Sequence, residues 1–118
     1  MAIEAIRVGG PSDPIKYTPS GADVAAGQVV DMGTWVAVAI CDITDGVEGS
    51  LETEGQYDFL KYSAQAVTLG ATVYWDEGTN TATTTSGYGE AVIGKCTYAA
   101  GASDARVRVK LMGALGGA

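Results

Sequence analysis

The feature that most constrains the fold of this chain is a succession of short segments in which apolar and polar residues alternate, with turn residues between them. Alternation with a period of two, enriched in β-branched and aromatic residues, predicts strands. We expect ten strands, at residues 2–8, 15–18, 28–32, 35–41, 49–53, 57–62, 72–75, 81–85, 91–98 and 105–112. No window keeps a 3.6-residue apolar stripe, and the best helical candidate, residues 63–69, has room for one or two turns at most. The pattern therefore predicts an all-β fold, a small antiparallel β-barrel or sandwich with little helix.

Two stretches of the chain resemble each other. Residues 24–30 read VAAGQVV and residues 67–73 read VTLGATV, and each stretch leads through a turn into a strand with a cysteine, Cys41 or Cys96. The repeat predicts two similar β units packed face to face, with both cysteines buried as reduced thiols at equivalent core positions. The alternative is coincidence in a chain rich in Ala, Gly and Val.

The length of 118 residues predicts a single domain that spans residues 1–118. Aromatic residues make up only 8% of the chain, so the core is lean and contacts with other copies become a source of further stability. We therefore expect a homo-oligomer, and a trimer in preference to a dimer.

The charge of the chain limits its partners. Fourteen acidic residues against seven basic ones give a net charge of −7, which repels phosphate backbones and anionic lipid. The longest apolar run, residues 35–41, is too short to cross a bilayer, and the N-terminus lacks the basic start and apolar stretch of a secretory signal. We expect neither nucleic acid nor a membrane as a partner.

The residues needed for common catalytic sites are missing. Histidine is absent, which removes Ser-His-Asp and Cys-His catalysis and the usual zinc patterns. Neighbouring acids lie in or beside predicted turns, where solvated carboxylates are ordinary. These pairs are Asp42 and Asp45, Glu52 and Glu54, and Asp76 and Glu77. Residues 89–96 nearly match the phosphate-binding loop G-x-x-x-x-G-K-[ST], but Cys96 replaces the hydroxyl and the segment is predicted to be a strand. We expect no enzyme activity, no cofactor and no metal site.

Four aromatic residues have two interpretations. Trp35, Tyr74, Trp75 and Tyr88 are either a platform on which a sugar stacks or the large members of a small β core or interface. We expect the second.

The last predicted strand carries a basic stripe. Arg106, Arg108 and Lys110 alternate with apolar residues, so they share one face of the strand. Two interpretations remain open: pairing with acids of this chain such as Glu52 and Glu54, or contact with another molecule.

The first ten residues are a second candidate contact. They read as a short apolar strand followed by the joint Gly9-Gly10-Pro11, and a hinged strand can add to the edge of a partner's sheet. Its candidate interface residues are Ile3, Ile6 and Arg7. Residues 1–10 are thus either an N-terminal arm or a strand of this domain's own barrel.

Taken together, the order and spacing of short β and turn motifs resemble the capsid cement, or decoration, proteins of tailed bacteriophages, a family long catalogued as a domain of unknown function. The resemblance covers almost the whole chain, although each motif is short. The motifs are YTP at residues 17–19, VAAGQVV at 24–30, VAVA at 36–39, ITDG at 43–46, GSLETEG at 49–55, LGATVYWD at 69–76, TTT at 83–85, IG at 93–94 and ARVRVKL at 105–111.

The resemblance implies a β-barrel-like protein that binds the outside of an assembled capsid, commonly as an oligomer at symmetry axes, with terminal segments touching the major capsid protein. It implies no catalytic residues, a place on the exterior of the virion, and synthesis in the cytoplasm of the bacterial host. The competing hypotheses are a carbohydrate-binding β module or small glycosidase, and a structural β domain of a phage tail or of a larger cellular assembly.

Overall fold

The computed structural model describes residues 4–10, 14–85 and 91–112, and these residues form strands, turns and loops without a helix. The strands form two antiparallel sheets, which confirms the predicted all-β fold, and neither sheet closes into a barrel. Each of the ten predicted segments overlaps one observed strand. Residues 63–69, the best helical candidate, contain turns and single bridges, and Ala64 has a φ of 59°, outside the right-handed helical region.

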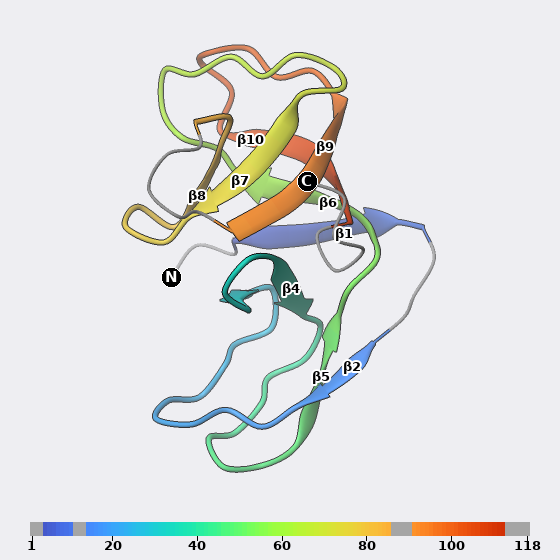
Figure 1. The fold of residues 1–118 in the computed structure, drawn as a ribbon, viewed down its shortest axis with the longest axis vertical. Coiled ribbons are helices and arrows are strands. Elements are labelled where there is room, and N and C mark those ends of the chain that lie inside the picture. Colours follow the sequence, from blue (N-terminus) through green and yellow to red (C-terminus); the bar gives the residue numbers. More distant parts are fainter. Residues whose placement is uncertain (1–3, 11–13, 86–90, 113–118) are drawn as a thin grey trace.

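The larger sheet has six strands and forms the upper part of the molecule in Figure 1. In spatial order they are β1 (Ala5–Gly9), β6 (Gly55–Leu60), β10 (Arg106–Leu111), β9 (Ala91–Tyr98), β7 (Thr72–Asp76) and β8 (Thr81–Thr83). The smaller sheet has four strands and lies below it. Its order is β2 (Ile15–Tyr17), β5 (Gly49–Glu52), β4 (Val36–Ala39) and β3 (Val29–Asp31). We call residues 14–54 the small-sheet unit and residues 55–112 the large-sheet unit; β1 is added to the edge of the second.

The two sheets repeat one topology. The order β2-β5-β4-β3 in the small-sheet unit corresponds to β6-β10-β9-β7 in the large-sheet unit, so β1 and β8 are additions at the two edges of the larger sheet. The registers agree as well, because Val29 lies opposite Val38 in one unit and Thr72 lies opposite Lys95 in the other. The sequence repeat is therefore a repeat of structure.

The turns that precede β3 and β7, the second strand of each unit, also make the same hydrogen bonds. The amides of Gly27 and Gly70 donate to the carbonyls of Ala39 and Cys96, over 2.7 and 2.9 Å. These glycines have φ angles of 83° and 86°, which side chains with a Cβ rarely adopt. The glycine shared by both halves of the sequence repeat is thus required by the same left-handed turn.

One part of the repeat prediction is wrong. Cys96 is buried as expected, but Cys41 is exposed. The shared hydrogen bonds align Cys96 with Ala39, which lies two residues before Cys41. Strand β4 ends at Ala39, and the chain turns away before Cys41, so this side chain leaves the core.

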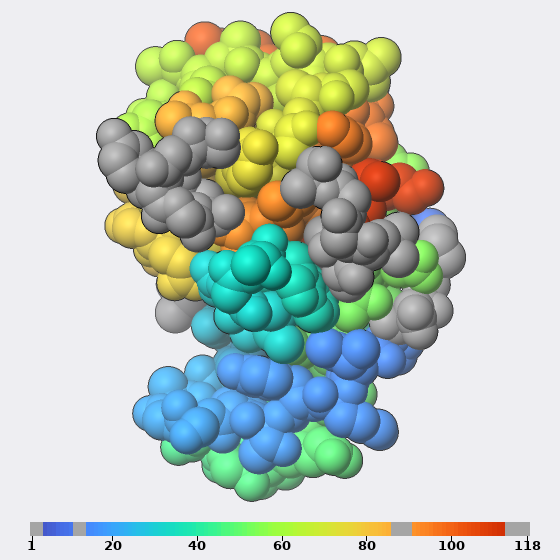
Figure 2. Space-filling model, in the orientation of Figure 1, coloured from blue at the N-terminus to red at the C-terminus, as the bar shows by residue number. Residues whose placement is uncertain are grey.

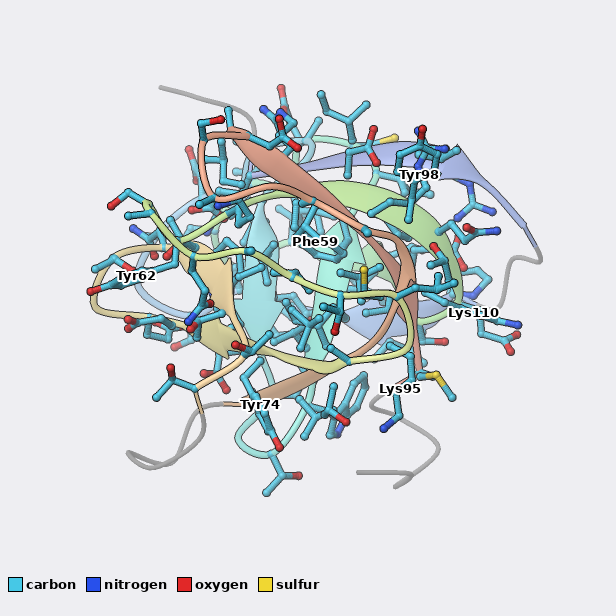
Figure 3. The ribbon with its side chains drawn as sticks, turned by 90° about the horizontal axis from the view of Figure 1, so that it is seen from above. Phe59, Tyr62, Tyr74, Lys95, Tyr98 and Lys110 are labelled. Carbon is cyan, nitrogen blue, oxygen red and sulfur yellow. The ribbon has the colours of Figure 1, made fainter. Side chains whose placement is uncertain are left out.

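The main core lies inside the curled larger sheet. Its largest side chains are Tyr57, Phe59 and Trp75, each 1% exposed or less, with tilted ring pairs whose centroids lie 5.9 and 6.3 Å apart. Seen from above, Phe59 lies in the middle of the molecule with the strands around it (Figure 3).

The smaller sheet has a core of its own and also closes the main one. All four residues of β4 are buried, although strand side chains point alternately to opposite faces. Val36 and Val38 join the main core, whereas Ala37 and Ala39 join a second cluster that includes Leu51. In Figure 2 the cyan segment around β4 lies against the yellow and orange surface of the larger sheet. The smaller sheet is therefore buried on both faces at this strand.

Candidate protein-binding face

The outer face of the larger sheet, the face turned away from its core, displays the predicted basic stripe. On β10, Val107, Val109 and Leu111 are at most 2% exposed and point inward. Arg106 and Arg108 are half-buried and Lys110 is exposed on the other face. The alternation of the sequence thus placed these three cations correctly, and Figure 3 shows Lys110 pointing away from the core.

Arg108 is paired within the chain. Its Nε and Nη2 donate to the two carboxylate oxygens of Asp58 on β6, over 2.9 and 3.3 Å, and its guanidinium lies 5.7 Å from the ring centre of Tyr98 on β9. The bond to Asp58 raises the pKa of the Arg108 guanidinium. Arg106 donates to the backbone carbonyl of the same residue over 3.1 Å. The acid that joins the stripe is therefore Asp58, whereas Glu52 lies 3.9 Å from Arg7.

Lys110 lies beside another lysine. Its cross-strand neighbour on β9 is Lys95, whose Nζ donates to Thr72 Oγ1 on β7. Neither lysine forms an ion pair with a carboxylate among the residues that the structure describes. Like charges placed opposite each other on neighbouring strands destabilise the pairing. Sequence analysis missed Lys95, because the register of β9 against β10 is what places it here.

Strand β1 lies on the edge of the larger sheet and pairs with β6. Ile6 and Val8 are 44% and 45% exposed on the outer face. Arg7 points to the inner side, where it donates to the hydroxyl of Tyr57 over 2.8 Å and to the carbonyl of Gly10 over 2.8 Å. Burial raises the pKa of the Tyr57 hydroxyl, and Arg7 opposes that rise. Ile3, the third predicted contact of this segment, lies outside the described residues.

A shallow depression of about 190 Å³ lies over the paired part of the stripe, between Asp58, Tyr98, Asp104, Arg106 and Arg108. It is open to solvent and has both polar and apolar lining, so it suits a protruding side chain of a partner better than an enclosed small molecule.

Three of the six acids considered as catalytic pairs accept backbone amides in turns, whereas Glu52 is buried on β5 near Arg7 and is not the solvated turn acid that was expected. Asp42 accepts the amide of Ala26, Asp45 accepts that of Gly21, and Asp76 accepts that of Gly78, all over 2.8–2.9 Å. In the described ranges no group of three metal-ligating side chains is brought together, and no helix long and apolar enough to span a membrane occurs.

The tryptophans do not form a stacking platform. Trp75 is 1% exposed in the main core, and Trp35 is half-buried against the smaller core. Tyr98, by contrast, is 69% exposed and lies on the outer face beside Arg108. Tyr88 lies outside the described residues.

Charge is divided unequally between the two units. The small-sheet unit carries seven acids and one lysine, a net charge of −6, whereas the large-sheet unit carries five acids and five bases. The basic outer face therefore belongs to the neutral unit, and nearly all of the net negative charge lies on the other.

The described residues thus form an all-β protein whose larger sheet has an outer face of cations and exposed apolar side chains. A model of the phage cement protein family matches residues 10–111, nearly the whole chain, and the chain belongs to that family. This confirms the resemblance seen in the sequence and indicates a structural role in the phage capsid. No curated protein and no solved structure matches the chain.

Proposed function

We propose that this protein binds the outer surface of a tailed-phage capsid, contacts the major capsid protein, and stabilises the assembled shell. The observation that supports the proposal most directly is the family match over residues 10–111. A protein that binds only the assembled state stabilises that state by mass action, which is the physical basis of cementing. Synthesis in the host cytoplasm and assembly on the virion exterior follow from this function.

The proposed contact surface is the outer face from β1 to β10. Ile6 offers exposed apolar area at the edge strand, and Arg106 and Arg108 lie two strands away around the depression beside Tyr98. Arg7 contributes by holding β1 to the sheet through Tyr57. Ile3 precedes Ile6 in the same terminal segment, and Lys110 is a further proposed protein-contact residue near the other end of β10 from Arg106.

Each exposed ionic contact is worth only about 0.2–1 kcal/mol and weakens with salt. Several copies bound together multiply such terms, so we propose that the protein acts as a homo-oligomer, with a trimer preferred to a dimer. No enzymatic step is part of this function.

Mixing the purified protein with capsids that lack it, followed by cryo-electron microscopy and thermal rupture of the shells, tests the proposal. We expect ordered density on the capsid exterior and a higher rupture temperature. Bare shells at saturating protein would contradict it.

Charge reversal tests the surface itself. Arg106→Glu should weaken decoration, and the effect should shrink as salt is raised. Lys16→Glu is the matched control, because Lys16 is exposed on β2 of the smaller sheet, outside the proposed surface. Equal loss with both variants would mean that net charge, and not this surface, controls binding.

The carbohydrate-binding alternative is disfavoured by the burial of Trp75. The tail-protein alternative predicts rings or fibres in place of decorated shells, so the same images separate it from the proposed function.

A further inference from the structure

The cations of the outer face fall into two groups with different surroundings. Arg106 and Arg108 donate to the carboxylate or carbonyl of Asp58. Lys95 and Lys110 lie opposite each other and form no ion pair with the residues that the structure describes. We call these two lysines, with Thr72 beside them, the lysine flank. In Figure 3 the labelled Lys110 and Lys95 lie at the right and lower right of the view, below Tyr98.

An opposed lysine pair is unfavourable on its own and becomes favourable when an acidic partner lies against it. The flank therefore fits a partner surface that carries carboxylates. The chain itself contains such a surface, because the small-sheet unit has a net charge of −6.

The most exposed part of that charge lies on two adjacent loops, residues 20–28 and 42–48, which we call the acidic end. Asp23, Asp42 and Asp45 are exposed there, and each carboxylate has one oxygen fixed by a backbone amide. A groove of about 460 Å³ runs between the loops, lined by Asp23, Asp42 and Gln28 among others. Its volume and its two carboxylates suit a lysine side chain.

The internal repeat shows that these acids are not required by the fold. The bridge between Val24 and Ile43 corresponds to the bridge between Val67 and Ala100, so Asp23 corresponds to Ala66 and Asp42 to Ala99. The same turn forms in the large-sheet unit without either carboxylate. The acids are an addition to the small-sheet unit alone, on a part of the surface that the larger sheet does not cover.

The face of the sheet that carries the lysine flank has different surroundings in the two units. In the small-sheet unit the residues equivalent to Thr72 and Lys95 are Val29 and Val38, and these pack against the main core. The corresponding face of the large-sheet unit carries the polar side chains of Thr72 and Lys95, which are half-buried and belong to neither apolar cluster. One unit thus uses this face for contact inside the molecule, and the other presents it outward.

We propose that the lysine flank of one copy docks onto the acidic end of a second copy, in a head-to-tail contact. This contact specifies the homo-oligomer of the proposed function, yet it can be tested without capsids. Because the two surfaces differ, the contact is heterologous: it closes into a ring where the rotation between copies allows it and otherwise extends a chain of copies.

Sedimentation equilibrium of the full chain tests this contact. The wild type should associate at low salt and dissociate as salt is raised. Two charge-reversal variants, Lys95→Glu with Lys110→Glu and Asp23→Lys with Asp42→Lys, should each associate at least about tenfold more weakly, since like charges would then face each other.

A mixture of the two variants is the decisive measurement. The reversed flank of one variant meets the reversed acidic end of the other, so an equimolar mixture should regain association as mixed complexes, whereas each variant alone associates weakly. Lys16→Glu compared with Lys110→Glu gives a charge-matched control, and only the second should weaken association. Circular dichroism establishes that all variants keep the β fold.

A wild type that remains monomeric, variants that sediment like the wild type, or a mixture without mixed complexes would each overturn the contact. If the lysine variants associate normally but fail to decorate shells, the flank binds acidic groups of the capsid and the copy-to-copy contact is wrong. If the wild type associates as predicted but leaves shells bare, the contact stands and the proposed function is wrong.

Discussion

The two units of this molecule share one strand order and differ in what they bury and what they expose. The large-sheet unit surrounds Tyr57, Phe59 and Trp75, whereas the core of the small-sheet unit is built from Val, Ala, Ile and Leu with half-buried residues at its margin. The first is neutral overall and the second carries a net charge of −6. The two units therefore share a topology but differ in role: the large-sheet unit contains the main core, and the small-sheet unit covers that core and carries the negative charge.

The difference indicates where stability and binding reside. Core residues of the large-sheet unit should dominate the free energy of unfolding, while surface charges of both units should affect association with little effect on folding. Paired substitutions at equivalent positions of the two units test that division.

The two cysteines give the sharpest contrast. Under native conditions a thiol reagent should label Cys41 rapidly and Cys96 at least about 10³-fold more slowly, because Cys96 reacts only when the structure opens, and small domains are stable by about 5–15 kcal/mol. Variants with Cys41→Ser or Cys96→Ser leave one thiol each, so mass spectrometry over time gives both rates directly. Similar rates in the folded protein would mean that β9 is not a core strand.

Truncation of equivalent aromatic side chains should reduce the free energy of unfolding by different amounts in the two units. Phe59 faces Val107, and its counterpart Tyr17 faces Gly49 in the smaller sheet. Phe59 is fully buried and Tyr17 half-buried, so Phe59→Ala should cost about 3–5 kcal/mol and Tyr17→Ala roughly half as much. Urea unfolding measures both. Equal costs would contradict the assignment of the main core to the large-sheet unit.

Gly94 and Ala37 occupy the same register position in the two units, so substitutions at these positions can be compared. A Cβ at Gly94 would lie 1.9 Å from the carbonyl oxygen of Lys110, a backbone atom that cannot move aside, whereas position 37 already holds a Cβ. Gly94→Ala should therefore destabilise by about 1–3 kcal/mol or more through overpacking. Ala37→Gly should cost only about 0.5–1 kcal/mol. The reverse order in urea unfolding would show that the two strands are not equivalent.

The local parts of the fold could be predicted from the sequence, since strand alternation and turn residues act over a few positions. The repeat at residues 24–30 and 67–73 was visible for the same reason. The burial of Cys96 was predicted correctly, but the exposure of Cys41 was not, because the second unit contains an additional hairpin with β8, and β4 ends before Cys41. An alignment of the two units that places Cys41 opposite Cys96 is therefore two residues out of register.

The candidate binding face was predictable only in part. Alternation on the last strand placed Arg106, Arg108 and Lys110 on one face, which the structure bears out. Their neighbours, Asp58 and Lys95, depend on the register of β10 against strands distant in sequence. A period-two pattern states which face a side chain occupies but not which residue lies opposite it.

The smallest expected effect concerns the seam between the units, where Glu4 Oε1 accepts the amide of Val29 over 2.8 Å. Burial raises the pKa of Glu4 above its ordinary value of 4.5, and nearby Glu77 adds to the rise, although the bond from Val29 opposes it. A carboxyl whose pKa is raised by folding binds its proton more tightly in the folded state. Its contribution to stability is therefore present below the unfolded pKa and is lost as the pH rises through the folded pKa.

Glu4→Gln should remove this dependence while its amide oxygen still accepts from Val29. The free energy of unfolding of the variant minus that of the wild type should grow as the pH is raised from about 4 to about 7, and should reach a few tenths of a kcal/mol. Taking the difference cancels the titration of the other acids, which are common to both proteins. Glu77→Gln is the natural comparison, since burial followed by the charge of Asp31 raises the pKa of Glu77 in the same direction, and Glu77 is exposed. Its effect should be smaller than that of Glu4→Gln. A difference that shrinks with rising pH would mean that the charged carboxylate of Glu4 stabilises the seam, and the joint between the two units would then be electrostatic.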